Sequence, residues 1–143
     1  MPAPEPAAGS PPLGPFAPAV VPIPAQLLAC GALLTSVLAA AWLTSGYPWL
    51  WMIVWFPSVL VAIPLAIRRE RAFQVTCWIV VGLLLVLAVL GVFFGLFAHL
   101  PAAVILTAAT AVNPQKAPRR TTAAIRLGLL VTAVASVAWA LAF

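Results

Sequence analysis

The sequence predicts an all-α protein: a polytopic bundle of transmembrane helices preceded by a disordered, proline-rich tail. Of its 143 residues, 65% are hydrophobic and 6% are charged, and a water-soluble core of this size could not bury so much apolar surface. The basic residues fall in short clusters between apolar runs. Residues 73–112 carry no formal charge, and as one helix they would measure about 60 Å, about twice the hydrocarbon thickness of a bilayer.

The tail covers residues 1–25, and the transmembrane domain covers residues 26–143. Prolines recur throughout the tail. Each proline fixes φ and removes a backbone donor, so this segment should be disordered with a polyproline II tendency. A secretory signal peptide needs a basic region before its apolar core, whereas Glu5 is the only charged side chain before Arg68. We therefore expect an uncleaved cytoplasmic tail.

The first two spans are predicted at residues 26–45 and 48–67. Each contains twenty residues, which as a helix measure about 30 Å and match the hydrocarbon core. The turn Gly46-Tyr47-Pro48 separates them. The second span contains Pro57 and Pro64, and proline inside a helix removes a hydrogen bond, so we expect bends there.

The third and fourth spans are predicted at residues 73–95 and 99–113, with the turn between them at 95–101. Two basic clusters flank this pair, and the positive-inside rule places both clusters in the cytoplasm. An even number of crossings must then lie between them. The fourth span is short, about 23 Å as a helix, so it either thins the bilayer or re-enters. The residues that set this topology are Arg68, Arg69 and Arg71 in one cluster and Lys116, Arg119 and Arg120 in the other.

The fifth span is predicted at residues 123–143. The N-terminus is then cytoplasmic and the C-terminus lies outside, in a multi-pass protein of the plasma membrane. Trp and Tyr favour membrane interfaces, and in this arrangement most of them lie near the outer surface. That distribution favours five spans over the alternative of four.

Residues able to carry chemistry are scarce. The acids are Glu5 in the tail and Glu70 beside arginines, and no Gly-rich phosphate loop, paired carboxylates or Ser near a His and an acid can be found. The single histidine, His99, is expected at the outer turn as an interface anchor. Cys30 and Cys77 are expected to be reduced thiols without a third metal ligand. The sequence therefore predicts no catalytic residue, cofactor or metal, and no nucleic acid as partner.

Small residues at spacing four provide the candidate packing sites. Gly91 and Gly95 form a GxxxG pair in the third span, and Gly128, Thr132 and Ser136 form a stripe in the fifth. Such stripes let helix backbones approach closely. They favour a non-enzymatic scaffold or accessory subunit in the lipid bilayer, with a second copy or another membrane protein as partner.

The alternative is a small transporter or channel component for a neutral solute. It would need the intramembrane hydroxyl groups to converge on one water-filled path. The hydroxyl side chains concerned are Thr35, Ser36, Ser58, Thr107, Thr132 and Ser136.

One segment also resembles a known group of proteins. VGLLLVLAVLGVFFGLFAHLPAAVILTAATAVNP, followed by basic residues, is similar to the small multi-spanning integral membrane proteins of actinobacteria. The resemblance covers residues 73–120, about a third of the chain. It implies a bacterial plasma-membrane protein. That group has no assigned activity, so the resemblance carries over no site residue.

Overall fold

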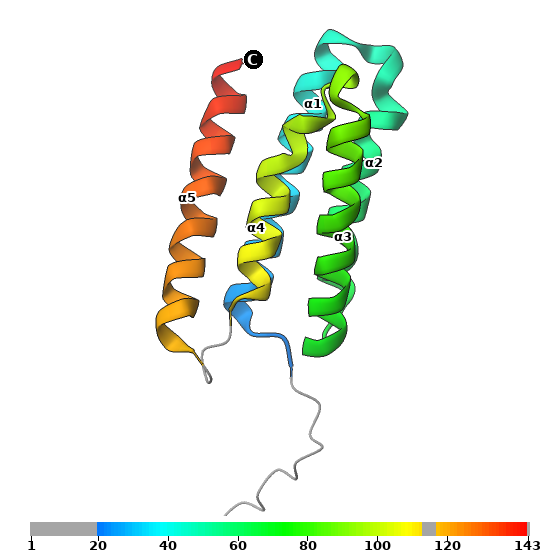
Figure 1. Ribbon diagram of the computed structural model, residues 1–143. Coiled ribbons are helices and arrows are strands. Elements are labelled where there is room, and N and C mark those ends of the chain that lie inside the picture. The colour runs from blue at the N-terminus through cyan, green and yellow to red at the C-terminus, as the bar shows by residue number, and fades with distance from the viewer. Residues whose placement is uncertain (1–19, 113–116, 143) are drawn as a thin grey trace, which may run out of the picture.

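The computed structural model describes residues 20–112 and 117–142. These residues form a bundle of helices that run side by side (Figure 1). A single bridge between Val20 and Arg69 is their only β-type pairing, so the prediction of an all-α bundle is confirmed. Most of the predicted tail, residues 1–19, lies outside the described part of the chain. The α-helices are α1 (Ile23–Gly46), α2 (Trp51–Ala62), α3 (Glu70–Leu90), α4 (Leu100–Thr110) and α5 (Pro118–Ala142).

The second predicted span is a composite helix. It begins as the 3₁₀ helix η1 (Pro48–Leu50), continues as α2, and tightens into the 3₁₀ helix η2 (Ile63–Ala66). Pro57 lies inside α2, while Pro64 lies in the first turn of η2. Proline cannot donate to the carbonyl one turn earlier, so the change of helix type at Pro64 is where the predicted interruption occurs.

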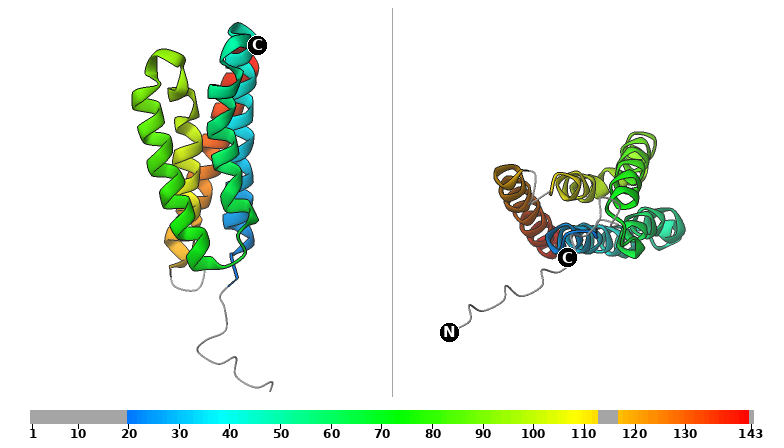
Figure 2. Two further views of the ribbon diagram at one scale, coloured as in Figure 1. Left: turned by 90° about the vertical axis from the view of Figure 1, so that its right-hand side faces the viewer. Right: turned by 90° about the horizontal axis from the view of Figure 1, so that it is seen from below.

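Four helical segments are long and apolar enough to cross a membrane, counted within the described residues. They are α1, the composite Pro48–Ala66, α3 and α5. The predicted fourth span differs, because α4 with the preceding 3₁₀ helix η4 (Leu96–His99) covers only Leu96–Thr110. It lies between the other helices, with α3 on one side and α5 on the other (Figures 1 and 2).

The turn between α3 and α4 begins at Gly91, four residues earlier than predicted. Helix α3 ends at Leu90, and η3 (Val92–Phe94) and η4 form the turn. Gly95 has φ of +74°, a conformation that glycine adopts without the steric cost of a Cβ. Gly91 and Gly95 therefore do not lie on a helix face, which corrects the expected GxxxG pair. They allow close packing within the turn instead, Gly91 against Leu96 and Gly95 against Leu43 of α1.

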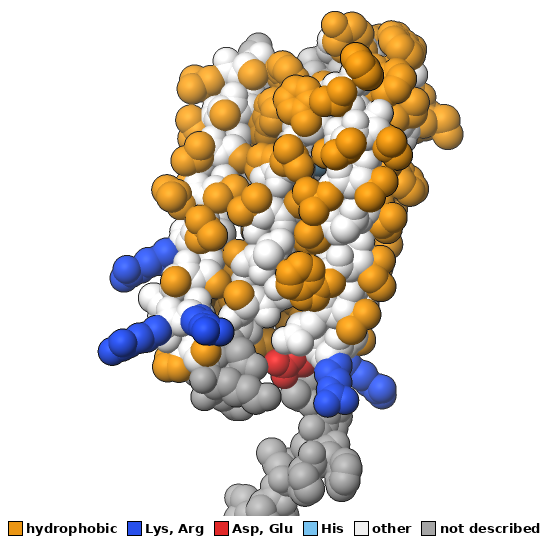
Figure 3. Space-filling view, in the orientation of Figure 1, with side chains coloured by type: hydrophobic (Ala, Val, Ile, Leu, Met, Phe, Trp, Pro, Cys, Tyr) orange, Lys and Arg blue, Asp and Glu red, His pale blue; other side chains and the backbone are white. Residues whose placement is uncertain are grey.

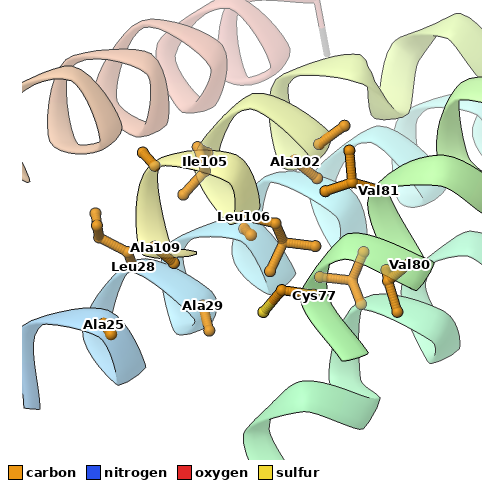
Figure 4. Close-up of a cluster of buried hydrophobic side chains, with 14 of the residues drawn as sticks. Ala25, Leu28, Ala29, Cys77, Val80, Val81, Ala102, Ile105, Leu106 and Ala109 are labelled. Atoms are coloured by element: carbon orange, nitrogen blue, oxygen red, sulfur yellow. The ribbon is translucent and has the colours of Figure 1, made fainter. Parts of the chain in front are cut away.

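Helices α1 and α4 form the centre of the bundle. Six of the eleven residues of α4 are buried, whereas only four of the twenty-five residues of α5 are. Small side chains of α1 and α4 face each other and the branched side chains of α3 (Figure 4). Because more than half of the residues of α4 are covered by protein, it does not need the length of a lipid-exposed span.

The basic side chains of the described residues gather at one end of the bundle (Figure 3). One cluster lies between the second span and α3, and the other lies in the first turns of α5. The chain leading into α1 reaches the same end, where the backbone N–H of Val21 donates to the carbonyl of Arg68 at 3.1 Å. The arrangement therefore brings the two clusters to one side, as an even number of crossings between them requires.

The orientation of the bundle can be tested by labelling single cysteines in a Cys30→Ala, Cys77→Ala background. Phe93 is 93% exposed at the turn opposite the basic end, and Ala72 and Ala117 flank the basic clusters. Because Lys and Arg are retained in the cytoplasm, an impermeant thiol reagent added to intact cells should label Phe93→Cys and leave Ala72→Cys and Ala117→Cys unlabelled. Labelling of Ala117→Cys from outside would contradict this orientation.

Candidate functional site

Three polar side chains meet inside the bundle and form what we call the polar cluster: Ser36, Ser58 and His99. Ser36 Oγ lies 2.9 Å from Ser58 Oγ and 2.9 Å from His99 Nδ1. The residues come from α1, α2 and the last position of η4. They are 0%, 4% and 2% exposed. Ser36 is thus the centre of a hydrogen-bonded chain that joins three segments far apart in the sequence.

The tautomer of His99 limits the directions of the hydrogen bonds in the cluster. A serine hydroxyl has one proton, and a neutral imidazole has one donor and one acceptor nitrogen. If Ser36 donates to His99 Nδ1, then Ser58 must donate to Ser36; if Nδ1 donates to Ser36, either serine can donate to the other, because the Ser36 oxygen can accept two hydrogen bonds. In both arrangements His99 Nε2 is buried without a hydrogen-bond partner.

The α1–α2 hairpin explains why the two serines meet. Ser36 precedes Tyr47 by eleven residues and Ser58 follows Tyr47 by eleven residues. Two helices that run antiparallel from a turn place positions equidistant from it at the same depth. Both serines also lie on buried faces. The shared depth could therefore have been read from the sequence.

The α3–α4 turn explains how His99 reaches the serines. The backbone N–H of Leu96 donates to the carbonyl of Gly91 at 3.1 Å, and that of Ala98 donates to Gly95 at 3.0 Å. These bonds satisfy the turn internally and fold η4 against α1. His99 consequently points into the bundle. The expectation that it is an interface anchor at the outer turn was wrong, because the chain folds inward immediately after Gly95.

The polar cluster separates two apolar parts of the core. The buried apolar residues form a smaller and a larger core cluster. On each of the three segments, the member of the polar cluster lies between an apolar residue of the smaller core cluster and an apolar residue of the larger one. The cluster is therefore a polar layer within the core. The three successions are Ala39, Ser36, Ala32 on α1; Val54, Ser58, Val61 on α2; and Ala98, His99, Ala102 at the start of α4.

The arrangement limits what the polar cluster can do chemically. A serine hydroxyl bonded to an imidazole is the start of a nucleophile–base pair, and the spacing of Ser36 and His99 in the sequence did not reveal this contact. The third, acidic partner is missing from the described residues around it, because Glu70 at the basic end of the bundle is the only acid they contain. Ser36 is fully buried and already engaged on two sides. Within the described residues no group of three or more metal-ligating side chains occurs.

The predicted packing residues of α5 face α1 to different degrees. Gly128 is buried, and a Cβ there would meet the side chain of Leu28. One turn on, a Cβ on Gly31 of α1 would lie 2.9 Å from Thr132 Oγ1. Ser136 is partly exposed, but its hydroxyl oxygen is buried without a partner in the structure. Small residues thus bring the backbones of α1 and α5 close together along two successive turns.

A tryptophan pair lies in the α1–α5 contact, at the end farthest from the basic residues. The rings of Trp42 and Trp139 are tilted by 36° with their centroids 5.0 Å apart. Trp42 Nε1 also donates to the carbonyl of Ala142 at 3.2 Å. Aromatic pairs of this geometry contribute about 0.5–1.5 kcal/mol beyond the area they bury, so α5 is held at both the glycine contact and this end.

The topology-determining residues lie on the surface of the basic end. Lys116 lies outside the described residues. The others are exposed: Arg68, Arg69, Arg71, Arg119 and Arg120.

The contribution of each serine to the stability of the bundle can be measured by single substitution. Ser36→Ala removes both hydrogen bonds and leaves Ser58 and His99 without partners, whereas Ser58→Ala removes one bond. Interhelical hydrogen bonds in membranes contribute about 0.6–2 kcal/mol each, so Ser36→Ala should lower the unfolding free energy in detergent by about twice as much as Ser58→Ala. Ser45→Ala, at an exposed position with only a local bond to Trp42, is the control. Equal losses for Ser36→Ala and Ser45→Ala would contradict the cluster.

Comparison with known proteins does not assign the chain to a family. No family model, curated protein or solved structure matches this chain. The functional argument therefore proceeds from the geometry of the described residues.

Proposed function

We propose that this chain is a non-enzymatic integral protein of a bacterial plasma membrane, a scaffold or accessory subunit that acts through helix–helix contacts. One observation carries the proposal: three buried polar side chains, Ser36, Ser58 and His99, are bonded to one another across three segments, in a layer closed on both sides by apolar packing. Polar groups used in this way fix helix positions. The lipid-facing surface then remains for contacts with a second copy or another membrane protein.

The burial of the polar cluster supports a non-catalytic role. A nucleophilic serine must be reached by its substrate, and the base must be free to take its proton. Ser36 is fully buried and shares its hydroxyl between Ser58 and His99. His99 has no acidic side chain to orient it among the described residues of its surroundings.

The positions of the other hydroxyl groups weigh against the transport alternative. Thr35 donates to the carbonyl of Ala32 at 2.9 Å, and Thr132 donates to the carbonyl of Gly128 at 2.8 Å. Thr107 is exposed and donates to Ala103 at 2.8 Å. Only Ser36 and Ser58 converge. A path for a neutral solute would need the hydroxyls to share one cavity, so the transport alternative rests on the polar cluster alone.

The scaffold proposal can be tested by site-specific photo-crosslinking in native membranes. A photoreactive amino acid at Val137, which is 57% exposed on α5, should give a discrete protein adduct if this face or its neighbours contact a partner. The same residue at Leu85 on α3 and at Met52 on α2, also exposed, samples the other faces. The proposal predicts a defined adduct from at least one face, of the mass of a dimer or of one partner protein.

The transport alternative predicts a different pair of results. Protein adducts would be absent from all three faces, and proteoliposomes containing the purified protein would swell in glycerol faster than empty liposomes. Ser36→Ala would then change the swelling rate. Swelling without any protein adduct would contradict the scaffold proposal.

A further inference from the structure

Helices α4 and α5 lie side by side (Figure 1), and their side chains line a groove on the surface of the bundle. Its outer stretch has a volume of about 590 Å³ and is lined by residues such as Leu100, Leu130 and Val134. Its inner stretch has a volume of about 480 Å³ and includes Leu127 and Arg120. Val104 lines both stretches, so they adjoin.

The inner stretch combines an apolar wall with one cationic end. Apart from Arg120, its polar lining residue is Thr107, whose hydroxyl already donates to the carbonyl of Ala103 at 2.8 Å. No acidic residue occurs between Leu100 and Ala142, so neither helix neutralises the guanidinium. Arg119 is adjacent in sequence, and Arg126 follows six residues later. The groove therefore offers positive charge at its inner end and hydrocarbon contact along its length.

The length of the groove along α5 matches the thickness of one leaflet of a bilayer. From Arg120 to Leu130, ten residues of α5 span about 15 Å, which is half of the roughly 30 Å hydrocarbon core. A headgroup at Arg120 would lie at the membrane surface where the basic residues gather (Figure 3). Its acyl chain would then run along Leu127 and Val104 toward the middle of the membrane.

We propose that the inner stretch of the α4–α5 groove binds an anionic phospholipid, with the headgroup phosphate at Arg120 and an acyl chain between α4 and α5. Basic pockets between transmembrane helices at the cytoplasmic surface are suited to anionic headgroups, and arginine binds phosphate through paired N–H groups. The charge of Arg120 favours a lipid over a partner helix as the occupant of the groove. An apolar helix would make no favourable electrostatic contact with Arg120, whereas an anionic lipid would be stabilised both by this charge and by the apolar wall.

Native mass spectrometry of the purified protein tests this proposal, with phosphatidylglycerol and phosphatidylcholine of identical acyl chains as probes. The wild type should bind phosphatidylglycerol more tightly. Arg120→Gln should weaken phosphatidylglycerol binding about fivefold, which corresponds to about 1 kcal/mol per basic residue at a membrane surface. Arg71→Gln, an exposed arginine of the other basic cluster, is the matched control and should leave the affinity nearly unchanged.

A second variant tests the apolar wall without changing the charge. Ala123 is exposed and lines the inner stretch, so Ala123→Leu should fill the groove without disturbing the core and should weaken binding of both lipids. Equal affinity of the wild type for the two lipids would overturn the proposal, as would equal losses from Arg120→Gln and Arg71→Gln. Unchanged lipid binding by Ala123→Leu, with loss of a protein partner instead, would assign the groove to a helix and also overturn it.

Discussion

A polar side chain in a bundle surrounded by lipid must find its hydrogen-bond partner inside the protein, and this constraint links the separate helices of the chain. Water is not available in hydrocarbon to satisfy an orphaned donor or acceptor. His99 Nδ1 meets the constraint by bonding to Ser36, which also bonds to Ser58, whereas His99 Nε2 has no partner. Sliding any of the three segments by one turn would move its polar residue into an apolar layer. The polar cluster therefore sets the depth of α1, α2 and the α3–α4 turn relative to one another.

The position of the short helix α4 also depends on the polar cluster. Its eleven residues are too few to cross a bilayer alone, and it packs against α1, α3 and α5. Alanines such as Ala102 and Ala109 let the α1 and α4 backbones approach (Figure 4), and close approach is what stabilises helix association in lipid. The position of His99 directly before α4 fixes where this helix begins. Helix α5 is then added on the outside, through the Gly128 contact and the tryptophan pair.

The sequence predicts the parts of this structure that follow from hydropathy, charge and proline. The span positions, the two basic clusters at one end and the interruption at Pro64 are of this kind, because each depends on local composition. The inward fold of His99 was not predicted, since it depends on the backbone bonds within the turn and on the close packing of Leu96 against Gly91. The serine pair was predictable in principle from its symmetry about Tyr47. Gly91 and Gly95 were assigned to a helix because spacing alone does not distinguish a packing stripe from a turn.

The most direct test of this account is a double-mutant cycle between Ser36 and His99, measured as unfolding free energy in detergent. Ser36→Ala, His99→Ala and the double variant are compared with the wild type, because the cycle isolates the energy of the pair from the cost of each truncation. The account predicts a coupling energy of about 0.6–2 kcal/mol, the range of interhelical hydrogen bonds in membranes. Additive losses, with a coupling energy indistinguishable from zero, would contradict the claim that His99 joins the α3–α4 turn to α1.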